Sequence, residues 1–218
     1  MNKMKLRHVI SALCLIGAPV FASGIEVKAG MSTVKAANDK GAFDAGIGYA
    51  IQLERFFAIV PEVNFQWIKY DKCATEPCQT VTQGALTSTL TTTNNHYTIP
   101  LMLNGRLYIP MGGDEVPAIQ PYLTVGLGYA WSMYEGSTPA YSSNGVSVAA
   151  SSTSTTLSGL MYQAMLGFQF NLGMMTEGSA SATNLILEAG YRGGQVEKSG
   201  FKTDMSGAVV RAGVAFRF

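Results

Sequence analysis

Two cysteines and one histidine are the residues of this sequence best suited to metal or redox chemistry. Cys73 and Cys78 have four residues between them, and His96 is the only histidine after residue 22. The cysteine spacing suits either a small disulfide loop or half of a metal site, but a four-ligand zinc site would then need carboxylates. In an oxidising compartment the pair favours a disulfide. We therefore expect neither a bound metal nor a cofactor.

His96 also belongs to the one arrangement that suggests catalysis. Thr98 lies two residues further on, and several serines lie nearby in the sequence, a combination that could serve a hydrolase. Segments rich in Ser and Thr supply such neighbours in any case, and no serine has the setting of a nucleophile elbow. We predict that the chain is not an enzyme.

A larger set of charged residues falls on one face of segments with strand-like alternation. Four acids and five bases make up this set, and an unpaired charge inside a narrow lumen would cost several kcal/mol. We expect mutual pairing, including a pair between Arg106 and Glu62. Such a network could plug a lumen or line a narrow polar path, and both interpretations stay open. The nine residues are Glu26, Lys28, Asp44, Glu62, Arg106, Glu188, Arg192, Arg211 and Arg217.

Eight segments could position these charges, because each alternates apolar and polar residues with the period of two that is typical of β-strands. In one of them, Leu101 and Leu103 alternate with Met102 and Asn104. No helical period competes. The expected strands are residues 25–33, 42–53, 56–70, 96–109, 118–134, 157–172, 184–195 and 206–218.

The connections between these segments alternate in length. The links at 71–95 and 135–156 are long, rich in Ser, Thr and Gly, and without apolar period, so we expect them to be solvated loops. The polar face carries glycines where a solvated face would carry Lys and Glu, which favours a crowded lumen over a soluble barrel. Residues 23–218 are therefore predicted to form an all-β fold, an eight-stranded antiparallel up-and-down transmembrane β-barrel.

The first 22 residues are typical of a secretory signal peptide. Lys3, Lys5 and Arg7 precede an apolar run over residues 9–21, and we expect cleavage after Ala22. Residues 1–22 hold three basic residues and no acidic one, so 12 basic and 14 acidic residues remain. This balance gives no reason to expect a nucleic-acid partner.

The end of the chain carries a specific resemblance. The sequence closes on AFRF, with Phe216 and Phe218 on the apolar face, and TIPLMLNGRLYIP is followed by IQPYLTVGLGYAW. These segments resemble the small outer-membrane β-barrel group that includes the OmpA membrane domain, OmpX and the opacity proteins. The resemblance implies a barrel surrounded by outer-membrane lipid, with long loops outside the cell and both termini in the periplasm. It also implies that the assembly machinery recognises Phe216 and Phe218.

Prolines inside the strands suggest a function. Pro61, Pro100 and Pro121 fall in three consecutive strands, and each removes a backbone donor from a ladder that has no edge. The setting of Pro100, HYTIPLML, is similar to that in OmpW-like barrels, which implies a conduit for small, hydrophobic molecules with a lateral opening at Pro100. We expect that opening near the outer rim, beside the loop ending at Asn95. The alternative is a surface-exposed adhesin or interaction protein, anchored by the barrel, whose outer loops bind host or other extracellular molecules.

Overall fold

A computed structural model of the chain describes residues 22–73, 80–83, 86–89, 91–111, 117–138, 141–143, 146–172 and 183–218. These residues form antiparallel β-structure with one 3-10 turn, Lys35–Ala37. None of the helical segments within these ranges is long and apolar enough to cross a membrane. The predicted signal peptide lies outside the described residues except for Ala22, so its cleavage stays a prediction.

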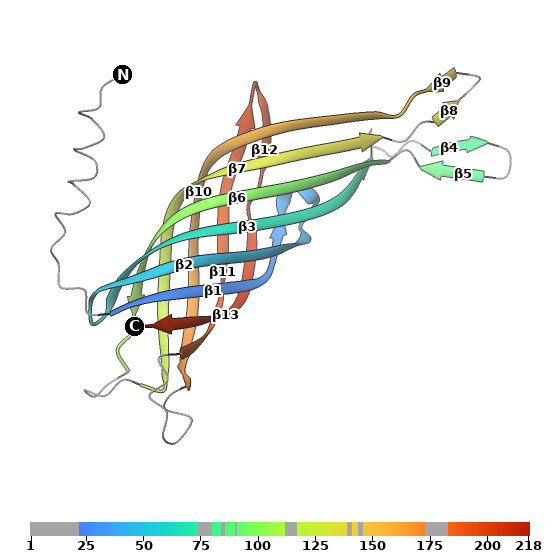
Figure 1. The fold of residues 1–218 in the computed structure, drawn as a ribbon. Coiled ribbons are helices and arrows are strands. Elements are labelled where there is room, and N and C mark those ends of the chain that lie inside the picture. The colour runs from blue at the N-terminus through green and yellow to red at the C-terminus, as the bar shows by residue number, and fades with distance from the viewer. Residues whose placement is uncertain are drawn as a thin grey trace, which may run out of the picture.

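Eight strands close into a ring (Figure 1). Neighbouring strands pair antiparallel around the ring, β10 pairs with β11, and β1 closes the ring against β13. The predicted eight-stranded up-and-down barrel is therefore confirmed. The strands are β1 (Ala22–Val34), β2 (Lys40–Glu54), β3 (Phe57–Cys73), β6 (Thr91–Tyr108), β7 (Ile119–Thr138), β10 (Ser151–Asn171), β11 (Thr183–Lys198) and β13 (Gly207–Arg217).

Shorter strands extend three of the connections at the long-loop end. Two separate hairpins are formed by β4 (Thr80–Gln83) with β5 (Leu86–Thr89) and by β8 (Tyr141–Ser143) with β9 (Val146–Val148). Strand β12 (Phe201–Asp204) pairs antiparallel with the end of β11, and a tight turn joins the two strands. Ser199 and Gly200 in that turn have φ angles of 51° and 85°, the positive values that two-residue hairpin turns require.

Four strands extend into the long loops that the sequence predicted at 71–95 and 135–156. β6 begins at Thr91 and β10 at Ser151, so the ends of the expected loops are strand. The upper parts of β3, β6, β7 and β10 continue as a paired sheet beyond the ring (Figure 1). We call residues 68–73, 91–96, 133–138 and 151–156 the protruding sheet. In β10, residues 151–156 are all Ser or Thr and five of the six are exposed, so neither face of this segment needs apolar side chains.

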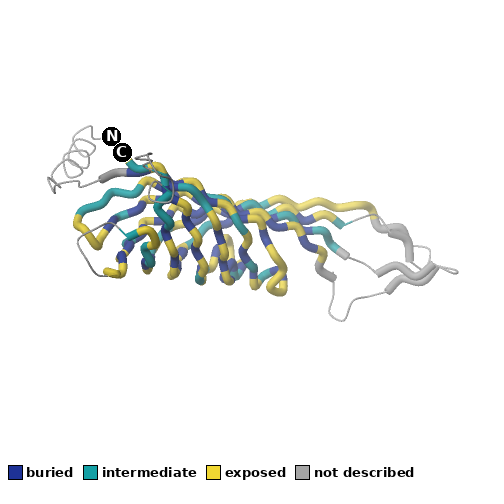
Figure 2. The backbone as a smooth tube through the Cα atoms, turned by 90° about the horizontal axis from the view of Figure 1, so that it is seen from below, coloured by how far each residue is buried: buried dark blue, intermediate teal, exposed yellow. Residues whose placement is uncertain are grey.

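Burial alternates along every ring strand, as Figure 2 shows. Outward apolar side chains are exposed, with Leu103 at 62% and Leu127 at 73%, whereas the inward Asp44 and Arg106 are at 0%. A protein that exposes large apolar residues over its whole girth needs an apolar solvent. The outer face of the ring is therefore the surface that contacts lipid.

Aromatic residues mark the two ends of this apolar surface. Trp67 and Trp131 are exposed near the long-loop end, while Phe57 and Phe216 are exposed near the short-turn end. Aromatic side chains gather at both interfaces of a membrane because they combine an apolar body with a polarisable edge.

Candidate functional site

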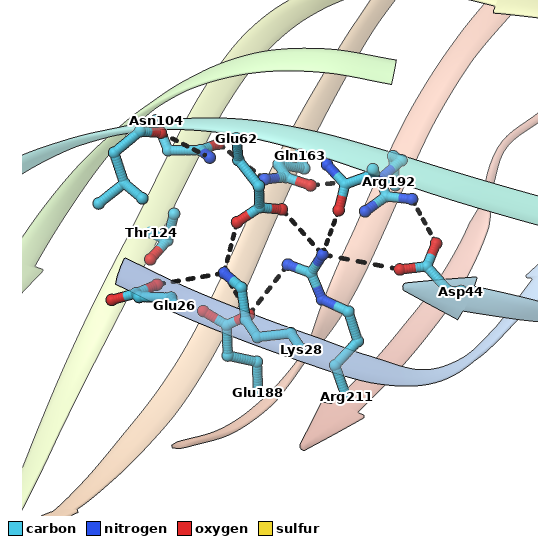
Figure 3. Close-up of polar contacts among 12 residues, drawn as sticks. Glu26, Lys28, Asp44, Glu62, Asn104, Thr124, Gln163, Glu188, Arg192 and Arg211 are labelled. Carbon is cyan, nitrogen blue, oxygen red and sulfur yellow. Dashed lines mark hydrogen bonds and ion pairs between the residues drawn. The ribbon is translucent and has the colours of Figure 1, made fainter. Parts of the chain in front are cut away.

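The lumen is crossed by a cluster of buried charges centred on Lys28. The Lys28 ammonium donates to Glu62, and its Nζ lies 3.4 Å from Glu26 Oε2 and 3.3 Å from Glu188 Oε2. β1, β3 and β11 supply these side chains from different parts of the ring (Figure 3). Inward-pointing carboxylates from three strands thus surround one cation.

Arg106 on β6 joins the cluster from the opposite wall. Its guanidinium binds Glu26 through both terminal nitrogens, with Nη2 at 2.8 Å from Oε2, and it lies 3.5 Å from Glu188. The Arg106 Cζ is also 4.4 Å from the centre of the Tyr122 ring, and the Tyr122 hydroxyl donates to Glu188 at 2.9 Å. Two-point binding and ring stacking hold this guanidinium in one orientation.

The part of the cluster nearer the long-loop end is centred on Arg211 and Arg192. Arg211 donates to Glu62 at 2.8 Å and to Glu188 at 2.9 Å. Arg192 donates to Asp44 at 2.5 Å, and Asp44 also lies 3.6 Å from Arg211. Four acids and four bases are therefore connected without interruption by ion pairs across the lumen.

Amide side chains extend the cluster sideways. Arg192 donates to Gln163 at 3.2 Å, Gln163 donates to Asn104 at 2.7 Å, and Asn104 donates to the Val60 carbonyl at 3.1 Å. The sequence analysis missed the roles of Gln163 and Tyr122. The alternation of apolar and polar residues in their strands was the available signal, because it places both side chains in the lumen. It does not show which other inward side chains they contact.

The cluster fills the lumen at its level. Its eight charged members are between 0% and 3% exposed, which leaves no water-filled path beside them. A cavity below the cluster, lined by Glu26, Tyr108 and Arg217 among others, holds about 10 Å³, room for about one water molecule. Of the two interpretations left open by the sequence, this geometry favours a plug.

Two expectations about the network are wrong. Arg217 lies apart from the ion pairs and donates instead to Tyr108 at 3.3 Å and Gln169 at 3.1 Å. Its position next to the end of the chain places it near the short-turn rim, away from the carboxylates. Arg106 does not pair with Glu62, because the register sets Arg106 opposite Ala58, four residues along β3 from Glu62.

Pro100 does not lie at the outer rim, which corrects the expected place of the lateral opening. It is the tenth of the 18 residues of β6, and the β3–β6 ladder continues above it as far as Cys73 and Thr91. Two pairs, at Pro100 and its neighbour Ile99, are missing from that ladder, but the register is unchanged on both sides. The side chain is buried, and Pro100 remains paired with Ala130 on β7.

The remaining candidate residues lie at the ends of strands. Phe216 and Phe218 point outward and are 49% and 71% exposed, as the sequence predicted for lipid-facing residues. The backbone of Cys73 ends β3, whereas its side chain and Cys78 lie outside the described residues, so the disulfide stays a prediction.

His96 is buried near the upper end of the lumen. Its Nε2 lies 3.4 Å from the Tyr70 hydroxyl, and its ring packs edge-on against Tyr134. Thr98 donates to Ser132 at 2.9 Å. Across the described part of the chain, no group of three or more His, Cys, Asp or Glu side chains is arranged to hold a metal ion.

A closed ring with an apolar outside and a plugged polar inside defines an eight-stranded β-barrel of the outer-membrane type. A family model described as outer membrane protein beta-barrel domain matches residues 9–218. The chain belongs to this family, and its place is the outer membrane. No curated protein matches the chain by sequence.

Three solved structures illustrate the likeness in fold. Neisserial surface protein A is 13% identical with a TM-score of 0.50, over 90% of this chain and 97% of that one. Ail, the attachment invasion locus protein of Yersinia pestis, solved with the heparin analogue sucrose octasulfate, is 14% identical with a TM-score of 0.47, over 90% and 98%. OprG from Pseudomonas aeruginosa is 16% identical with a TM-score of 0.39, over 90% and 96%.

Proposed function

We propose that this protein is a surface-exposed interaction protein, in which the barrel is an anchor and the protruding sheet binds an extracellular partner. The observation that carries this proposal is the open edge of the protruding sheet. On one side, Ser151 to Thr156 pair with β7. On the other side, the ladder to β11 begins only at Ser158, so within the described chain this edge of β10 has no partner.

The open edge is suited to receive another strand. Alternate residues of a strand direct their N–H and C=O groups to the same side, so about three of these six residues present unpaired groups. The segment reads SSTSTT, without charge or proline, and five of its six residues are exposed. Charged residues, prolines and bulges normally protect such an edge, and none occurs here.

The other edge of the protruding sheet provides a contrast within the same molecule. The upper part of β3 leaves β2 above Trp67, and its outward positions carry the exposed charges Lys69 and Asp71. Charged side chains discourage the addition of a strand. We therefore expect the partner to bind along β10 by adding an extended segment to the sheet.

The plugged lumen supports an anchor more than a conduit. A conduit for small hydrophobic molecules through the lumen would have to break the ion-pair cluster, and a lateral exit at Pro100 would lie in a wall whose register is continuous. The conduit therefore ranks behind the interaction protein, and both can be tested in the same set of experiments.

Adherence is the direct test. The full chain is expressed on a non-adherent Gram-negative host, and cells retained on epithelial monolayers are counted for wild type, Ser154→Lys and Ser137→Lys. Both serines are exposed, but Ser154 lies on the open edge, whereas Ser137 lies on β7 between two strands. We expect wild-type adherence to fall at least fivefold for Ser154→Lys and to persist for Ser137→Lys.

A flux measurement separates the alternatives. Purified wild-type barrel in liposomes is expected to leave the uptake of a small hydrophobic solute at the rate of protein-free liposomes. Raised uptake together with background adherence would replace the interaction proposal by the conduit. Equal adherence of the two lysine variants would show that the edge of β10 is not the binding surface.

A further inference from the structure

The outer wall of the barrel contains a groove where the ladder between β10 and β11 is interrupted. Their ladder joins Met161 with Gly194 and, higher up, Ser158 with Glu197, but the two residue pairs in between are missing. The register is the same on both sides of this interruption. A cavity of about 770 Å³ lies here, on the lipid-facing side of the wall.

Glycine allows the two backbones to approach at the base of the groove. A Cβ on Gly159 would lie 1.9 Å from the backbone oxygen of Gln195, and a Cβ on Gly194 would lie 2.5 Å from the backbone oxygen of Leu160. Both glycines line the cavity. The base is therefore bare backbone, and the depth of the groove comes from the side chains around it.

Side chains of two kinds surround this base. The membrane side is formed by Leu160, Tyr129, Tyr162 and Tyr191, all of them exposed on the outer face. The opposite side is polar and begins where the apolar alternation of β1 ends, at Lys35. The groove therefore crosses the boundary between the hydrocarbon of the membrane and its headgroup layer, where tyrosine is favoured. Its polar residues are Lys35, Ser158, Gln195, Glu197, Asp204 and Ser206.

The polar side offers one cation among many hydrogen-bonding groups. Among the described carboxylates, none forms an ion pair with Lys35, whereas Glu197 pairs with Lys202 at 3.2 Å. Asp204 accepts from the Ser206 backbone N–H at 2.9 Å through Oδ1. Carboxylate, amide and hydroxyl groups together suit the hydroxyls of a sugar, and a lysine suits a phosphate.

We infer that this groove binds a phosphorylated glycolipid of the outer leaflet. An acyl chain lies against Leu160 and the tyrosine rings, the sugar hydroxyls bind the amide and carboxylate groups, and a phosphate binds Lys35. A simple anionic phospholipid fits less well, because its phosphate could bind Lys35 but Glu197 and Asp204 would have no sugar hydroxyls to bind.

This site is independent of the proposed adhesive function, since none of its residues belongs to the open edge of β10. The test is native mass spectrometry of the folded full-length barrel in detergent, with purified lipid A added as the probe. Lipid A is a diphosphorylated glucosamine disaccharide with acyl chains. Its monophosphorylated form and phosphatidylglycerol are measured in parallel.

Three variants locate the binding. Gln195→Trp fills the groove, Leu160→Ser removes its apolar wall, and Phe43→Trp adds bulk to an exposed outward position on β2 that does not line the cavity. We expect one retained lipid A per wild-type barrel, at least fivefold less for Gln195→Trp and Leu160→Ser, and no change for Phe43→Trp. Lys35→Ala should weaken binding of the diphosphorylated form at least threefold.

Folding of each variant is checked by the heat-dependent shift of the barrel on gels. Equal retention of lipid A by folded Leu160→Ser, Gln195→Trp and Phe43→Trp would overturn the site. Retention of phosphatidylglycerol as strong as that of lipid A would overturn the glycolipid assignment, because the sugar would then contribute nothing to recognition.

Discussion

At the scale of single residues, the lumen illustrates how a buried charge is made tolerable. Arg106 is fully buried, and the cost of removing its charge from water is offset by two-point binding to Glu26 and by the ring of Tyr122. Desolvation of an ion in a protein costs several kcal/mol unless its partners are well placed. The burial of each charged side chain in the cluster is therefore made possible by its partners on other strands more than by its own strand.

We predict that Arg106→Ala lowers the free energy of unfolding by about 3 to 5 kcal/mol, because it leaves the Glu26 carboxylate buried without its main partner. In a double-mutant cycle with Glu26→Gln, the second change should cost less than it does alone, by about 1 kcal/mol or more. Urea unfolding of the barrel in detergent or lipid gives these energies.

Arg217→Ala is the control for this cycle. Arg217 binds neutral oxygens of Tyr108 and Gln169 near the rim, so its loss should cost about 1 kcal/mol. Its effect should add to that of Glu26→Gln within about 0.5 kcal/mol. Additivity in the Arg106 cycle as well would remove the Arg106–Glu26 pair from the explanation of stability.

At the scale of elements, Gly167 on β10 shows how the ring makes room for its contents. A Cβ at this position would lie 2.2 Å from Cζ of Tyr122, so the ring lies directly over the glycine. Gly167→Val should displace Tyr122 and cost about 1 to 3 kcal/mol through overpacking. Gly41→Ala is the control, since its nearest neighbour is the flexible end of Met31 at 3.1 Å. Equal unfolding energies for the two variants would contradict this account.

The proline in β6 leads to a further prediction. Pro100 lacks the donor that would face β3, and the pairs at that point are missing from the ladder. Pro100→Ala should restore one hydrogen bond and stabilise the barrel by about 1 kcal/mol. The new amide at residue 100 should exchange slowly, and solute uptake into liposomes should be the same as for wild type. Lower uptake in the alanine variant would instead support a gate at this place.

The same strands show what could be predicted from sequence. Alternation placed Leu101, Met102 and Leu103 on the correct faces, because a membrane outside and a polar lumen inside give each face a different solvent. It did not predict the strand at residues 151–156, where both faces meet water and apolar residues therefore do not alternate with polar ones. It also could not give partners across the lumen. Those follow from register, and a shift by one residue would turn Arg106 to the outer face.

At the scale of the whole molecule, the ring is closed by its two terminal strands. β13 pairs with β1 as far as Arg217 opposite Gly24, and Phe218 follows immediately. Phe218 is 71% exposed, and its ring lies 6.4 Å from that of Tyr49. It therefore contributes little packing within the folded barrel, and a role in stability alone does not account for an aromatic side chain at this position.

We predict that removing Phe218 impairs assembly in the cell much more than it lowers stability. Refolded in detergent, the truncated barrel should lose about 1 kcal/mol, the value of one aromatic contact. In cells, its amount in the outer membrane should fall several-fold, because the assembly machinery would lack the terminal aromatic residue that the family resemblance implies it recognises. Tyr49→Ala removes the same ring contact while keeping the terminus, and it should assemble normally. If the truncated chain reaches wild-type levels with the same heat-dependent gel shift, Phe218 is not needed for assembly and closure of β13 on β1 suffices for insertion.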